Sequence, residues 1–151
     1  MKQTEPIEEH PFQLAFRGSF TSTLRWHHLD ALWKTLKDQQ GDDWYIYAIG
    51  HPPPDSLVSR EKLHEFIDEI DQLIRTEHAE DYCGIVYADK LADPALIKIY
   101  DPHNLGVSCG YSDNPPLPGW VLSKIPPCDL NTTQMVGGAR KRWWERIFKT
   151  G

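Results

Sequence analysis

The sequence predicts an α+β fold: a two-layer sandwich in which two amphipathic helices pack on one face of a mostly antiparallel sheet of four or five strands. Three observations predict it. Short β-rich runs alternate with segments of helical periodicity, two of these runs are joined by a short connection, and 40% of the 151 residues are hydrophobic. Helices between the first strands permit a right-handed parallel crossover, which favours a mixed sheet over a purely antiparallel one.

The first half of the chain is expected to hold two strands and two helices. Alternating apolar residues predict a half-buried strand over 12–17, and a run that is apolar on both sides predicts an interior strand over 44–49. Helical spacing of Trp26, Leu29, Leu32, Trp33 and Leu36 predicts a helix capped by Ser22 or Thr23. The clearest helix follows Ser59, with apolar positions Leu63, Phe66, Ile67, Ile70, Leu73 and Ile74 opposite an acidic face.

The second half begins with a predicted antiparallel hairpin, in which β-rich runs over 83–88 and 95–100 are joined by a turn containing Asp93-Pro94. After Asp101 the chain is rich in glycine, asparagine and proline, which predicts a long ordered loop. An edge strand is expected at 120–122.

Charge divides the chain into a body, residues 1–136, and a tail, residues 137–151. The tail has a net charge of +4, which leaves −10 for the remainder of a chain whose total is −6. An acidic body with a basic tail is typical of a contact element. Three cysteines without paired spacing, and no basic-then-apolar leader, predict a single cytoplasmic domain with no transmembrane segment.

The loop after the hairpin contains the candidate catalytic residues Asp101, His103 and Cys109. A cysteine nucleophile needs a base to form the thiolate, and the base needs an orienting acid. These three residues match those roles, so a small Cys/His-dependent enzyme or a thiol- or metal-binding protein is one hypothesis. Their close spacing also suits an ordinary turn, and no metal-ligand spacing or nucleotide-binding glycine pattern occurs, so neither a metal nor a cofactor is predicted.

The tail is the more distinctive feature, because as a helix it gathers an apolar stripe between cations. The predicted partner-binding residues are Arg140, Lys141, Arg142, Trp143, Trp144, Arg146, Ile147 and Phe148. Such a stripe either enters a groove of another protein or packs back on its own domain as a terminal helix. The acidic body disfavours nucleic acid, and a single short helix would bind a membrane surface weakly.

The favoured hypothesis is therefore a noncatalytic accessory protein that binds a partner protein through its Pro-rich loop, its cationic aromatic tail, or both. It rests on the charge asymmetry and on the lack of a recognisable catalytic signature. A second alternative is a small-ligand-binding module, in which Tyr111 and Trp120 line an apolar pocket beneath the loop.

Overall fold

A computed structural model describes residues 10–104, 117–130 and 138–148, and these residues form an α+β fold. Four α-helices and five strands occur among them, together with a short 3-10 helix, η1 (Pro102–Asn104). The helices are α1 (Pro11–Phe16), α2 (Trp26–Asp38), α3 (Arg60–Glu77) and α4 (Gly138–Phe148). The strands are β1 (Thr21–Ser22), β2 (Tyr45–Ala48), β3 (Val86–Ala88), β4 (Leu96–Ile99) and β5 (Trp120–Ser123).

The strands form one sheet in the order β1-β3-β4-β5-β2, and every neighbouring pair is antiparallel. The predicted hairpin is confirmed, since Val86 pairs with Ile99 and Ala88 with Ile97. The alternative of a mixed sheet is wrong for the described residues. The helix between β2 and β3 carries the chain from one edge of the sheet toward the other, so no parallel neighbour is formed.

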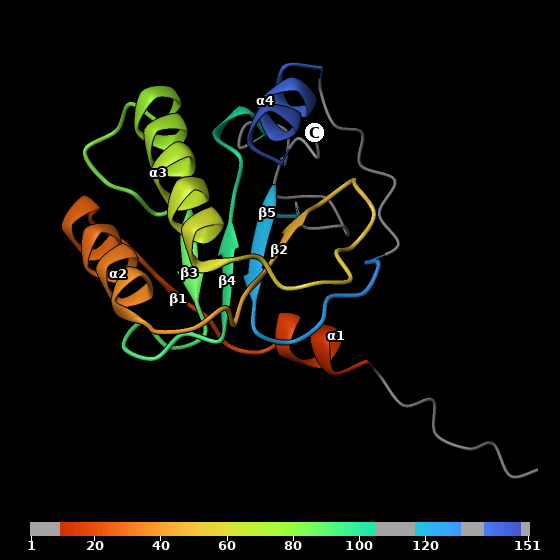
Figure 1. Cartoon of the computed structure of the whole chain (residues 1–151). Coiled ribbons are helices and arrows are strands. Elements are labelled where there is room, and N and C mark those ends of the chain that lie inside the picture. The colour runs from red at the N-terminus through yellow and green to blue at the C-terminus, as the bar shows by residue number, and fades with distance from the viewer. Residues whose placement is uncertain (1–9, 105–116, 131–137, 149–151) are drawn as a thin grey trace, which may run out of the picture.

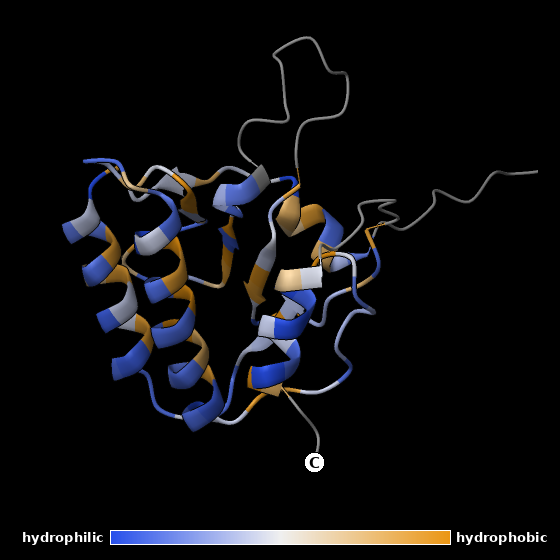
Figure 2. Cartoon of the chain, turned by 90° about the horizontal axis from the view of Figure 1, so that it is seen from above, coloured by the Kyte–Doolittle hydropathy of each residue, from blue (hydrophilic) through white to orange (hydrophobic). Residues whose placement is uncertain are grey.

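Three helices pack on one face of this sheet. In Figure 1, α2 and α3 lie side by side over the β1 and β3 side, while α4 lies nearer β5 and β2. Figure 2 shows apolar residues of α2 and α3 turned toward the sheet and hydrophilic residues turned outward. The main core combines alternate strand residues, including Ile46, Ile97 and Leu122, with Leu32 of α2 and Phe66 of α3. The two long helices were predicted because their stripes keep the 3.6-residue period over several turns.

The opposite face of the sheet has its own, smaller core. Tyr47, Leu96 and Val121 point to this side, where they pack with Phe12 of α1. Alternation along β2, β4 and β5 therefore places one set of side chains beneath α2, α3 and α4 and the other set beneath α1.

The strand predicted over 12–17 is wrong, because these residues form α1. Pro11 occupies the first turn, where its missing N–H costs no hydrogen bond, and His10 Nδ1 accepts from the backbone N–H of Phe12 at 3.1 Å. Phe12 and Phe16, four residues apart, lie on the same side of the helix, and Leu14 is 56% exposed. In so short a segment, alternation and helical spacing both fit the two phenylalanines.

Two further expectations are corrected at the sheet edges. The predicted interior and edge strands are exchanged: β5 pairs with β4 on one side and β2 on the other, whereas β2 forms an edge of the sheet. Ser22 and Thr23 do not cap α2: Ser22 belongs to edge strand β1, and the buried Thr23 hydroxyl donates to the carbonyl of Val86 at 3.0 Å. Arg25 is the residue that precedes the first turn of α2.

Among the helices that the structure describes, none has the length and apolar character needed to span a membrane.

Candidate interaction site on the C-terminal helix

The eleven residues of α4 form a helix whose apolar stripe faces the body of the protein. A helix of this length is marginal in isolation and needs packing to form. Ile147 is buried, and the ring of Trp143 lies 5.3 Å from the ring of Trp120 and 6.1 Å from that of Phe66, between ring centroids. Trp144 and Phe148, with centroids 4.1 Å apart, extend this cluster. The stripe therefore packs back on the domain, which was one of the two predicted arrangements.

Arg140 fastens the first turn of α4 to the body through a buried ionic contact. Its Nε donates to Asp101 Oδ2 at 2.8 Å, and its Nη2 donates to Asp101 Oδ1 at 3.0 Å and to Glu77 Oε1 at 2.7 Å. The side chains of Arg140 and Asp101 are only 16% and 7% exposed. Burial alone would lower the pKa of Arg140, but the two carboxylates outweigh it and raise this pKa, so the guanidinium stays charged.

Asp101 thus has contacts that its predicted catalytic role did not include. Besides binding Arg140, its Oδ1 accepts the backbone N–H of His103 at 2.9 Å, which caps η1. The side chain of His103 is exposed, and Cys109 lies outside the described residues. The structure thus brings Asp101 into contact with the tail. A catalytic arrangement of Asp101 with the His103 imidazole and the Cys109 thiol stays a prediction.

Of the two predicted ligand-binding residues, only Trp120 lies in the described part of the chain. Tyr111 lies outside it, as does most of the Pro-rich loop. Trp120 is almost fully buried on the face of the sheet that α4 covers. Its ring is a packing partner of Trp143.

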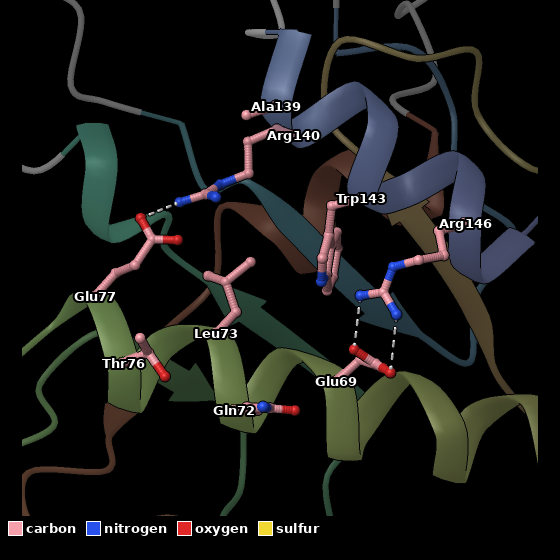
Figure 3. A pocket seen from close by; sticks show the side chains of 9 residues that line it. All are labelled: Glu69, Gln72, Leu73, Thr76, Glu77, Ala139, Arg140, Trp143 and Arg146. Atoms are coloured by element: carbon pink, nitrogen blue, oxygen red, sulfur yellow. Dashed lines mark hydrogen bonds and ion pairs between the residues drawn. The ribbon is translucent and has the colours of Figure 1, made fainter.

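A groove of about 420 Å³ runs between α3 and α4 (Figure 3). Arg140 bonds Glu77 near one end, and Arg146 bonds Glu69 at 3.0 Å near the other. The residues that line the groove are Glu69, Gln72, Leu73, Thr76, Glu77, Ala139, Arg140, Trp143 and Arg146. The groove therefore has apolar surface from Leu73 and Trp143, and it lies between two ion pairs that join α3 to α4.

The outer face of α4 is cationic. Lys141 and Arg142 are exposed, and none of the described carboxylates forms an ion pair with either. Arg146, although paired with Glu69, keeps 61% of its side chain exposed. Glu145 is the single acid in α4. Packing and ion pairing hold the inner face, and the outer face presents positive charge to solvent.

One neighbour of α4 was not singled out from the sequence. The His51 ring lies 5.8 Å from the Trp144 ring, between centroids, at the end of β2. Burial lowers the pKa of His51, the charge of Lys141 lowers it further, and Glu145 partly opposes them. The contact between His51 and α4 could not be predicted, because nothing in the local sequence around His51 indicates a helix that begins more than eighty residues later.

Comparisons of the chain with protein-family models, with curated proteins and with solved structures find no match.

Proposed function

We propose that this protein is a noncatalytic accessory protein that binds an acidic segment of a partner protein on the outer face of α4. The observation that carries the proposal is the exposed pair Lys141 and Arg142, which have no carboxylate partner among the described residues. Apolar packing and the Arg140 contacts fix α4, so these cations are held in place before binding. Less conformational entropy is then lost on association.

Charge complementarity points to an acidic partner. The body outside the tail is strongly acidic and repels other acidic surfaces, so an acidic segment is attracted locally to α4 rather than to the protein as a whole. Arg146 extends the cationic face toward the groove, where Trp143 offers an aromatic contact. Tryptophan and arginine commonly contribute a large share of binding energy at protein interfaces.

The test begins by immobilising the full-length protein and identifying the proteins that it retains at low ionic strength. The binding of each purified candidate is then measured by calorimetry with the double variant Lys141→Glu/Arg142→Glu. We expect about a tenfold or larger loss of affinity, because two attractions become repulsions. Raising the salt concentration should weaken binding of the unaltered protein.

A matched control keeps the same change in net charge. Lys34 and Lys90 are exposed and lie in α2 and in the β3–β4 turn. The variant Lys34→Glu/Lys90→Glu should bind the partner with nearly unchanged affinity. Equal losses in the two double variants would contradict a specific role for α4, and retention of RNA or anionic vesicles in place of a protein would contradict the proposed partner class.

A further inference from the structure

Lys98 lies on the face of the sheet opposite α2, α3 and α4, in an aromatic setting. Register places Ser22, Tyr87, Lys98 and Val121 in one cross-strand row, so their side chains share this face. The Lys98 Nζ lies 4.1 Å from the centroid of the Phe16 ring and 4.0 Å from that of the Phe20 ring. Both rings come from α1 and the segment that follows it.

Lys98 differs from several lysines of the fold in having no acidic partner among the described residues. Lys34, Lys37 and Lys62 form ion pairs with Asp38, Asp68 and Glu65, respectively. No carboxylate among the described residues pairs with Lys98, although it is half-buried. Burial lowers the pKa of Lys98, whereas the two ring faces favour the ammonium form. The result is a partly desolvated cation that lacks a counter-ion.

Further groups around Lys98 are suited to an organic ligand. Tyr87 of β3 is the cross-strand partner of Lys98, and its ring packs edge to face with that of Tyr100, which follows β4, with ring centroids 5.6 Å apart. Ser22 Oγ, on the same row, is buried without a hydrogen-bond partner in the described part of the chain. Unpartnered buried hydroxyls are uncommon because leaving one unpaired is unfavourable.

We propose that Lys98 anchors a binding site for a small organic monoanion, an aromatic carboxylate. One ammonium in the row balances one negative charge. The rings of Phe16, Phe20 and Tyr87 provide apolar contact for the aromatic part of the ligand. Inorganic phosphate, which is strongly hydrated and carries more than one charge, fits this aromatic surrounding poorly. This site is distinct from the partner-binding face of α4 and from the predicted pocket of Tyr111 and Trp120.

The test is an NMR titration of the full-length protein with sodium benzoate, followed through backbone amide shifts. We expect saturable shifts centred on Tyr87, Lys98 and Tyr100. Lys98→Gln should raise the Kd for benzoate at least tenfold, and Lys98→Arg should retain binding, because it keeps the charge. Each amide spectrum also shows whether the variant is folded. If Lys98→Gln does not fold, Lys98→Arg and the ligand series decide the question.

Lys124 offers a matched control, since its Nζ lies over the Trp44 ring at 5.3 Å. Lys124→Gln should leave the benzoate Kd unchanged. Benzyl alcohol, a neutral molecule of similar shape, and inorganic phosphate should each bind at least tenfold more weakly than benzoate. The proposal is overturned if benzoate causes no saturable shifts around Lys98, if benzyl alcohol binds equally well, or if Lys98→Gln binds normally; Lys98 then serves only to hold α1 on the sheet.

Discussion

Arg140 and Asp101 form the ionic contact on which the position of α4 most depends. The geometry is bidentate, with both carboxylate oxygens of Asp101 accepting from the guanidinium. Gly119 allows the carboxylate to reach this position, because a Cβ at Gly119 would lie 3.1 Å from Asp101 Cβ. Removing a single partner of such a pair leaves a buried charge without compensation, which is more destabilising than the pair is stabilising.

Arg140→Ala should therefore lower the free energy of unfolding by about 3 kcal/mol, measured by urea denaturation. Arg140→Lys should recover part of this loss, because lysine keeps the charge but cannot form the two-pronged contact. Arg146→Ala is the control: the Arg146 side chain is 61% exposed, so the loss of its pair with Glu69 should cost under about 1 kcal/mol. Similar losses for Arg140→Ala and Arg146→Ala would contradict the role given to Asp101.

His51 should make the stability of the protein depend on pH. Its pKa is lowered in the folded state, so folding favours the neutral ring beside Trp144. The contribution to stability is complete above the ordinary pKa of about 6.5 and is lost as pH falls through the lowered, folded-state pKa. Between pH 7.5 and pH 5, the unaltered protein should lose more unfolding free energy than His51→Gln does. Identical losses in the two proteins would show that His51 does not titrate in this way.

At the scale of the element, α4 depends on its contacts more than on its own propensity. Ile147 is 3% exposed and is the residue of α4 that is buried most deeply in the core. Lys62 Nζ also donates to the carbonyl of Ile147 at 2.7 Å, which provides a partner for one of the last carbonyls of the helix. The burial of Ile147 and the positive charge of Lys62 thus both stabilise the C-terminal end of α4.

Ile147→Ala should lower the free energy of unfolding by about 3 kcal/mol, and Ile147→Val by about 1 kcal/mol, measured by urea denaturation. The difference follows from the number of buried carbon atoms removed. Far-ultraviolet circular dichroism should show a fully folded body for Ile147→Val. A loss below about 1 kcal/mol for Ile147→Ala would mean that α4 contributes little to the core.

Elements with many periodic positions were predictable, and short ones were not. The apolar stripe of α3 keeps the helical period from Leu63 to Ile74, so no other structure fits it. α1 has six residues and β1 has two, lengths at which a pattern cannot distinguish helix from strand or strand from loop. The interior position of β5 depends on pairing with β2, which is more than seventy residues away, and no local signal reports such a partner.

In the whole molecule, two features that were predicted separately are in contact: Asp101, from the loop after the hairpin, pairs with Arg140 of the cationic tail. Charge predicted that the tail would be distinctive, and helical spacing predicted that its aromatic residues would share a face. The partner of Arg140 could not be predicted, because any of the chain's many carboxylates could have filled that place. The packing of the tail determines which carboxylate pairs with Arg140. The Trp143 ring lies against Trp120, and this contact brings the first turn of α4 to Asp101.

Native-state amide hydrogen exchange tests the central claim, that α4 is a fixed part of the fold and presents its cations from a held position. The amides of residues 142–148 are compared with those of residues 66–74 in α3. We expect slow exchange in both segments of the unaltered protein, with protection of 142–148 selectively reduced in Arg140→Ala. Exchange of 142–148 at the rate of an unstructured chain, while 66–74 stays protected, would show that α4 is not a fixed part of the fold and that the tail is a detached anchor.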